Sequence, residues 1–494
     1  MSSSPADTGP AETGPEPAAP AEVSTAPGNS AVLIFVLALG GLAFSVLQSM
    51  VAPALPAIGH ALGSSPASTG WIVTAYLLAA AVATPIAGRM GDLWGRRRIL
   101  IAVLAILAAG CVIDALSSSI VALIAGRAVQ GAAGAVFPLA FGILRDALPP
   151  RRVSTAVGLL SAMLGVGGGA GIVLAGPIVT HLGWHWIFWL PLIVTGVALA
   201  GTLALVPESA RRAAGGLSLP GAVLLAGWLV SLLLAVSDGA SWGWTSLPTL
   251  ALIAGAVVIG VAWIAVEVKS RQPLVDLRVL LQRPVWAADL SALAFGFGMF
   301  GSFLLVPGLL EAPAGSGYGF GQSVSSAGLF LLPGSIMLLL CGPISGLMTR
   351  RLGARAPIVA GGLVCCLSFA LPAVQHSQIW QVLACATGSG IGLGLAYAAL
   401  PNAIIAHVAP EQTGVATGVN TLARSVGSSI GAATVAAILA ARVTPAGLPG
   451  NSAFSLGFGA CAAMFGLAAA AALLIPSGTA AGRRRGRRIA VLAH

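Results

Sequence analysis

The sequence predicts an all-α polytopic membrane protein with 14 transmembrane helices, arranged as two six-helix repeats plus an inserted two-helix hairpin. Three observations predict this fold. The 494 residues are 57% hydrophobic and only 8% charged, which is too apolar for a soluble globular domain. Apolar runs long enough to cross a hydrocarbon core of about 30 Å as helices recur along the chain. Two segments of the first half also return, in modified form, in the second half.

The two ends of the chain differ from its apolar middle. Residues 1–28 consist mostly of Pro, Ala, Ser, Thr and Gly, with a few acids and no basic residue. We therefore expect a disordered cytoplasmic tail rather than a signal peptide, which needs a basic start. Residues 476–494 contain the string RRRGRR. We expect this basic cytoplasmic tail to be attracted to anionic membrane lipids rather than to nucleic acid.

Fourteen apolar segments between the tails predict membrane-spanning helices. Barrel strands do not fit, because they are about ten residues long and alternate between apolar and polar residues. The predicted helices are 31–54, 68–87, 99–117, 119–143, 154–180, 186–206, 218–236, 248–267, 285–310, 324–347, 356–374, 379–406, 414–439 and 453–475. The first six form one half (29–206), the next two lie in a linker (207–283), and the last six form the second half (284–475).

The basic residues predict the orientation of these helices. With a cytoplasmic N-terminus, nearly all of the 24 lysines and arginines fall in cytoplasmic loops or in the C-terminal tail. Arg442 falls in an outer loop, and Arg127 and Arg424 lie inside predicted helices. Because cytoplasmic loops are enriched in lysine and arginine, we expect both termini in the cytoplasm and the protein in the cell membrane.

An internal repeat supports the division into halves. The string GRMGDLWGRR at residue 88 is matched by GLMTRRLGAR at 346, and PRRVSTAVG at 150 is matched by PEQTGVATG at 410. The two offsets, 258 and 260 residues, agree. Paired halves of this kind place a substrate site between them near the middle of the membrane, which favours a transporter over a receptor or a membrane-embedded enzyme.

The string at residue 88 resembles the signature that members of the major facilitator superfamily carry between their second and third helices. The fixed positions of this signature are held by Gly88, Asp92, Gly95, Arg96 and Arg97. The resemblance implies a latch at the cytoplasmic face, in which the aspartate faces a helix N-terminus of the other half and pairs with the arginine of the motif. An anion is stabilised beside a helix N-terminus, and glycine permits a close approach. The second half has Arg350 at the aspartate position.

A second string, LIAGRAVQGAAGA, resembles the fourth-helix motif of the same family, with Arg127 and Gln130 in place. An arginine inside a membrane is costly and indicates function, and the resemblance implies a part in proton coupling. Because arginine keeps its own proton, we expect Arg127 to tune a neighbouring carboxylate or a chain of water molecules that carries the transported one. The candidates are Asp289, Glu311 and Asp114. Asp289 is preferred, because the aromatic residues that follow it suggest a cavity wall.

A third string, GVGGGAGIVLAGPIV, resembles the fifth-helix motif of drug/proton antiporters through Gly165, Gly176 and Pro177. With HLGWHWIFWLPL, PLVDLRVL and NTLARSVGSSIG, it makes the chain between the tails similar to the fourteen-helix branch of drug/proton antiporters. The chain departs from that branch at two places. Leu47 stands where an aspartate is usual in the first helix, and Thr180 and His181 replace a pair of glycines.

The predicted function is secondary active export of amphipathic or hydrophobic small molecules, a drug or a secondary metabolite, by proton antiport with alternating access. The alternative is a metabolite uniporter or symporter on the same fold. The expected substrate cavity is lined by Gln48, Tyr76, Phe297, Phe300, Asn402, Asn420 and Arg424. No cofactor, metal ion or nucleic acid is expected, since the six cysteines lack C-x-x-C spacing and His181 and His185 are too few for a metal site. The sequence does not indicate which oligomeric state the protein adopts.

Overall fold

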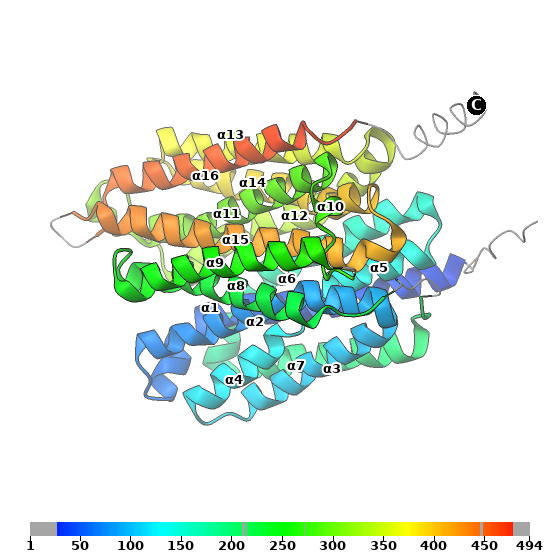
Figure 1. The fold of residues 1–494 in the computed structure, drawn as a ribbon. Helices are drawn as coiled ribbons and strands as arrows, with labels where there is room; N and C mark the ends of the chain where they lie inside the picture. The colour runs from blue at the N-terminus through cyan, green and yellow to red at the C-terminus, as the bar shows by residue number, and fades with distance from the viewer. Residues whose placement is uncertain (1–26, 210–212, 214, 271, 445–447, 478–494) are drawn as a thin grey trace, which may run out of the picture.

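The computed structural model describes residues 27–209, 213, 215–270, 272–444 and 448–477, which form a bundle of long helices (Figure 1). The helices are α1 (Pro27–Ala61), α2 (Pro66–Trp94), α3 (Arg96–Ala115), α4 (Ile120–Gly131), α5 (Val136–Ala147), α6 (Pro150–Leu182), α7 (Trp186–Leu205), α8 (Leu219–Trp242), α9 (Leu247–Lys269), α10 (Leu277–Leu280), α11 (Arg283–Glu311), η1 (Ala314–Ser316), α12 (Val324–Leu352), α13 (Arg355–Val374), α14 (Ile379–Ile405), η2 (Pro410–Gln412), α15 (Thr413–Ala441) and α16 (Asn451–Ala472). The predicted tails at 1–28 and 476–494 lie almost wholly outside the described residues.

Fourteen helical segments of the described chain are long and apolar enough to cross a membrane, which confirms the predicted architecture. The fourth segment differs in form, because it consists of α4 and α5 with a break at residues 132–135. Two glycines beside this break lie directly against α2. A Cβ atom on Gly131 would lie 2.4 Å from the Tyr76 carbonyl oxygen, and one on Gly134 would lie 2.4 Å from Thr84 Oγ1. The same glycines weaken the helix and allow the close contact.

The two halves use the same helix packing. In the first half α1 packs on α6 and α7, α2 on α4, and α3 on α4 and α7. In the second half α11 packs on α15 and α16, α12 on α14, and α13 on α14 and α16. The halves meet mainly along two equivalent pairs, α2 with α15 and α6 with α12, and also where α6 meets α14 and α5 meets α15. Small residues allow these crossings: a Cβ atom on Gly158 would lie 2.7 Å from the Gly342 carbonyl oxygen.

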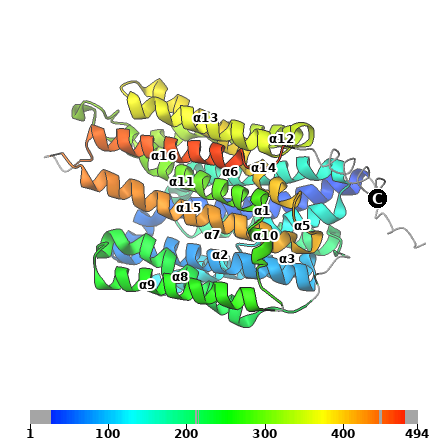
Figure 2. The ribbon, with the colours of Figure 1, turned by 45° about the horizontal axis from the view of Figure 1, so that its top comes forward.

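Three hydrophobic cores hold the bundle together. One is built from residues between Leu33 and Val206, joined by Ile405, and a second from residues between Val285 and Ile475. The third joins the α8–α9 hairpin to α2 and α15, and the hairpin lies alongside these two helices (Figures 1 and 2). The hairpin therefore covers part of the seam between the halves. The domain boundaries at 206 and 284 remain a prediction.

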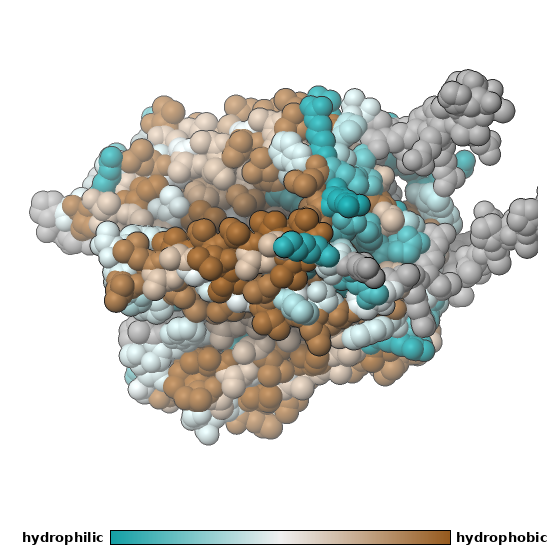
Figure 3. All heavy atoms as spheres, in the orientation of Figure 1, coloured by the Kyte–Doolittle hydropathy of each residue, from teal (hydrophilic) through white to brown (hydrophobic). Residues whose placement is uncertain are grey.

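The connections at 95, 148–149, 206–209, 215–218, 272–282, 353–354 and 406–412 lie at one end of the bundle, which we call the basic end. Helix α1 begins and α16 ends at this end. Hydrophilic residues gather there, on the right of Figure 3, whereas the middle of the visible face is hydrophobic. This distribution fits a bundle whose middle lies in lipid and whose ends lie in water.

Candidate functional site

Asp92 connects the two halves at the basic end. It lies near the C-terminal end of α2 and is only 1% exposed. Its Oδ1 accepts a hydrogen bond from the Gly414 backbone N–H (3.1 Å), and its Oδ2 accepts one from Val415 N–H (3.0 Å). Both N–H groups belong to the first turn of α15, where no helical carbonyl is available to them. The carboxylate thus caps a helix of the second half and is stabilised by the positive end of the helix dipole.

Arg96, at the start of α3, donates hydrogen bonds to the same carboxylate. Its Nε and Nη2 donate to Asp92 Oδ1 at 3.1 and 2.6 Å, and its Nη1 donates to Asp146 Oδ2 at 2.5 Å. Further hydrogen bonds reach the carbonyl oxygens of Gly142 (3.3 Å) and Pro410 (2.5 Å). The guanidinium is 1% exposed, so two carboxylates and two carbonyls replace its water.

Arg145 provides a second link between the halves from the end of α5. It donates hydrogen bonds to the carbonyl oxygens of Val408 (3.0 Å) and Ala409 (3.2 Å) and to Thr413 Oγ1 (2.5 Å). We call Asp92, Arg96, Arg145, Asp146 and the first turn of α15 the basic-end network. The sequence motifs did not indicate Arg145 or Asp146. Their only signal was a pair of opposite charges at the end of an apolar run.

The other residues of the motif at residue 88 contact the first half or permit special backbone positions. Arg97 donates to the carbonyl oxygens of Thr202 and Leu203 at the end of α7. Gly95 adopts φ +109°, a conformation that side chains rarely allow. A Cβ atom on Gly88 would lie 2.6 Å from the Gly414 carbonyl oxygen, so only glycine permits this contact between α2 and α15. Arg350, at the equivalent position of the second half, is exposed.

A second buried cluster lies between α2, α3 and α4, toward the opposite end of the first half. Arg127 is 1% exposed and donates hydrogen bonds to the Ile72 carbonyl oxygen (3.2 Å) and Gln130 Oε1 (2.7 Å). Its guanidinium carbon lies 4.1 Å from the centre of the Tyr76 ring, which is a favourable cation–π distance. Asp114, fully buried, lies close enough to attract Arg127 electrostatically. We call Tyr76, Asp114, Arg127 and Gln130 the α3–α4 cluster.

Asp114 is the unusual member of this cluster. Neither of its carboxylate oxygens has a hydrogen-bond partner among the described residues. The side chain lies directly against α4, since a Cβ atom on Gly126 would fall 1.9 Å from Asp114 Oδ1. A buried carboxylate without hydrogen bonds is costly in its charged form. The site therefore favours binding of a proton, while Arg127 favours its release.

The other two candidate acids lie away from Arg127. Asp289, on α11, accepts a hydrogen bond from Asn420 Nδ2 (2.9 Å) on α15. Glu311 is exposed at the far end of α11. The preference for Asp289 came from its neighbours in the sequence, whereas in the structure Asp114 is the acid beside Arg127.

A small cavity of about 20 Å³ lies between the halves in the middle of the bundle, and we call it the central cavity. Its first-half wall comes from α5 and α6, and its second-half wall comes from α14 and α15. It is lined by Phe137, Phe141, Leu164, Tyr397, Leu400, Pro401, Thr417, Asn420, Thr421 and Arg424. Of the predicted cavity residues, Asn420 and Arg424 line it.

The other predicted cavity residues lie elsewhere. Tyr76 is under Arg127, and Asn402 donates to the Ser154 carbonyl oxygen nearer the basic end. Phe297 is buried on α11, Phe300 packs against the ring of Phe303, and Gln48 does not border the central cavity. Sequence reasoning missed Tyr397, Phe137 and Phe141, because an aromatic residue in an apolar run shows no preferred direction.

Of the two glycines named in the fifth-helix motif, Gly165 lies at a helix contact and Gly176 does not. A Cβ atom on Gly165 would lie 1.9 Å from Leu338 Cδ2, so Gly165 allows α6 to approach α12. Pro177 is inside α6, and no atom lies within 4 Å of a Cβ atom built on Gly176. The motif therefore contributes to the contact between halves at Gly165.

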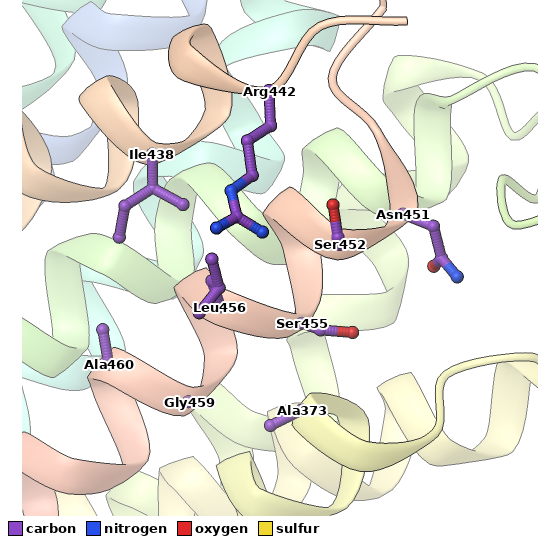
Figure 4. A pocket seen from close by; sticks show the side chains of 9 residues that line it. All are labelled: Ala373, Ile438, Arg442, Asn451, Ser452, Ser455, Leu456, Gly459 and Ala460. Carbon is purple, nitrogen blue, oxygen red and sulfur yellow. The ribbon is translucent and has the colours of Figure 1, made fainter.

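A larger open groove of about 800 Å³ lies at the end opposite the basic end. Arg442 reaches from the end of α15 toward α16, beside Ser452 and Ser455 (Figure 4). All residues of this groove belong to the second half. It therefore does not lie between the halves, where alternating access places a transport path.

The sequence and the geometry agree with one family of known proteins. The model of the Major Facilitator Superfamily matches residues 37–432. The chain belongs to this superfamily. It is therefore a multi-pass membrane transporter of small molecules and not an enzyme.

Among similar proteins of this superfamily, the tetracenomycin C resistance and export protein of Streptomyces glaucescens is 30% identical over 78% of this chain and 71% of its own length. The multidrug resistance protein Stp of Mycobacterium tuberculosis is 30% identical over 79% of this chain and 72% of its own. Among solved structures, that of the proton:xylose symporter XylE covers 92% of this chain and 97% of its own, with a TM-score of 0.65 and 13% identity. At that identity the likeness concerns the fold alone.

Proposed function

We propose that this superfamily member is a proton-driven exporter in the cell membrane, with its basic end and both termini in the cytoplasm. Its substrates are amphipathic or hydrophobic small molecules. Two relatives of about 30% identity are named as an antibiotic export protein and a multidrug resistance protein, which supports export over uptake. The loops of the basic end, rich in arginine, support the orientation.

The observation that carries proton coupling is the buried Asp114 beside Arg127. When Asp114 is charged, its attraction to Arg127 is the main compensation for its burial. When Asp114 binds a proton, that attraction is lost and Arg127 is left with its partners Ile72, Gln130 and Tyr76. Protonation thus changes the contact between α3 and α4. A proton that binds from the outside and leaves to the inside can exchange for substrate in this way.

The basic-end network supplies the gate. In this structure Asp92 and Arg145 hold the first turn of α15 against the first half. The cytoplasmic path to the central cavity is then closed, and substrate leaves outward. Opening requires that these buried polar contacts separate and become hydrated together, which favours two discrete states over a gradual change.

Proton coupling predicts that export depends on a pH gradient. Proteoliposomes that contain the full chain and a fluorescent lipophilic substrate are given a gradient, which an ionophore then collapses. We expect the rate of uphill transport to fall about tenfold or more on collapse, because a coupled exchanger loses its driving force. A rate that does not change on collapse means that the chain is a uniporter.

The proposed orientation predicts which introduced thiols can be labelled from outside the cell. Gln282 is exposed at the basic end, and Ser377 is exposed at the opposite end. The native cysteines are buried or half-buried, so their background labelling is low. With a membrane-impermeant thiol reagent on intact cells, we expect Ser377→Cys to be labelled and Gln282→Cys to be protected until the cells are permeabilised. The reverse pattern would invert the topology.

A further inference from the structure

Arg424 is a half-buried cation inside a membrane-spanning helix, without a partner of opposite charge among the described residues. It lies on α15, about three turns from the basic end, and its guanidinium carbon is 5.0 Å from the centre of the Tyr397 ring. Within the described part of the chain, no carboxylate forms an ion pair with it and no oxygen accepts a hydrogen bond from it. Arg96 and Arg127, by contrast, both donate hydrogen bonds to buried oxygens. An uncompensated charge at this depth is costly and indicates a ligand.

The surroundings of Arg424 define the chemistry of that ligand. It faces the central cavity, whose lining contains three aromatic rings, Phe137, Phe141 and Tyr397, and no acid. Asp289 accepts a hydrogen bond from the lining residue Asn420 and forms no ion pair with Arg424. The cavity therefore attracts an anion and repels a cation.

We infer that the central cavity binds amphipathic aromatic anions, with the carboxylate or phenolate of the substrate on the Arg424 guanidinium and its rings between Phe137, Phe141 and Tyr397. The inference rests on the proposed function, since it names the substrate class of the same exporter. The α14–α15 wall supplies the charge, and the α5 wall supplies the apolar surface. Arginine suits this position because its planar guanidinium can donate two parallel hydrogen bonds to a carboxylate.

The volume of the central cavity indicates in which conformational state the anion binds. About 20 Å³ is too small for an aromatic ring, so the two walls have to separate before a substrate enters. The walls belong to different halves, and separation of the halves at the basic end would widen the cavity. The closed structure is then the state after release, in which the Tyr397 ring alone faces the cation.

Binding to the full chain in detergent tests the inference without any transport. The probes are anthracene-9-carboxylate, its neutral methyl ester and the matching anthracenylmethyl ammonium. Binding of each probe is measured by the quenching of tryptophan fluorescence. We expect the carboxylate to bind about tenfold or more tightly than the other two. Equal or tighter binding of the ester or the ammonium to the unmodified protein would overturn the inference.

Variants assign the preference to one side chain. We expect Arg424→Ala to lose the preference for the carboxylate, and Arg424→Lys to keep part of it because the charge remains. The matched control is Arg442→Ala, which removes an exposed arginine of the same half outside the central cavity and should leave the preference unchanged. A preference that survives in a folded Arg424→Ala protein places the anion elsewhere and refutes the assignment.

Transport separates failure of this inference from failure of the proposed function. Export of an anion against entry of a proton moves net positive charge inward, whereas exchange of a monovalent cation for a proton moves none. A membrane potential that is negative inside should therefore speed export of the carboxylate. If the anion binds but flux does not depend on protons, the proposed proton-driven export is refuted and the anion site at Arg424 stands. If the ammonium shows proton-dependent flux and the anion does not bind, the anion site at Arg424 is refuted and the proposed proton-driven export stands.

Discussion

Replacement of Asp92 by asparagine is expected to stop most export while the protein still folds and inserts. The change removes the buried charge that binds the first turn of α15 and the Arg96 guanidinium. Asparagine can still accept one hydrogen bond, and Arg96 keeps Asp146. The closed state of the basic end therefore loses about 1–3 kcal/mol, which shifts the balance between closed and open states about 5- to 150-fold. An exporter that remains open to the cytoplasm cannot complete its cycle.

Two measurements test this result. The first is flux in proteoliposomes at equal protein content. The second is labelling of a Thr417→Cys reporter by an impermeant reagent from the basic side, since Thr417 lines the central cavity and is 2% exposed. We expect lower flux and faster labelling in Asp92→Asn.

Two further variants sharpen the test. Gly88→Val should act like Asp92→Asn, because its side chain pushes against the Gly414 carbonyl oxygen. Arg350→Ala is the control, because it alters the equivalent position of the second half, where the side chain is exposed. Wild-type flux and labelling in Asp92→Asn would remove the gate role of the basic-end network.

Much of the fold follows from the sequence because membrane helices have a physical length and composition. The predicted segment 379–406, for example, corresponds to α14 at Ile379–Ile405. The break between α4 and α5 was not predicted, because it accompanies the contact of Gly131 and Gly134 with α2. Glycines are common in membrane helices, so their presence alone does not mark a break.

The site was predictable only where a local motif indicates a contact. The pairing of Asp92 with an arginine of its own motif was implied by the resemblance of that motif to a family signature, and the structure has the pair at Asp92 and Arg96. The acid that interacts with Arg127 could not be predicted in this way, because Asp114 lies on another helix and the sequence favoured Asp289. The orientation of Tyr397 toward Arg424 likewise depends on how α14 packs on α15.

One membrane span contacts all three candidate regions. Helix α4 carries Arg127 of the α3–α4 cluster, and α5 carries Phe137 in the wall of the central cavity and Arg145 in the basic-end network. The break at 132–135 separates the first from the other two. A change in the attraction between Asp114 and Arg127 can therefore affect the cavity and the basic-end network through a single span, which is a short physical path for coupling.

This path makes Asp114 the residue whose neutralisation should separate proton movement from substrate movement. Asp114→Asn keeps the shape of the side chain and resembles the protonated state, so no proton can be taken up or released there. We expect uphill export driven by a pH gradient to fall about tenfold or more. Exchange of labelled for unlabelled substrate across the membrane should persist, because it needs only the substrate-loaded movement of the two halves.

The matched control is Asp289→Asn, a neutral change of similar size at the acid that the sequence favoured. Asp289 contacts Asn420 beside the central cavity and lies away from Arg127, so its loss should alter substrate affinity more than proton dependence. Both variants are measured for uphill export, for substrate exchange and for the half-saturating substrate concentration. If Asp114→Asn retains full dependence on the gradient while Asp289→Asn loses it, the proton is carried on α11. In that case the α3–α4 cluster carries no transported proton, and its role is to hold α2, α3 and α4 together.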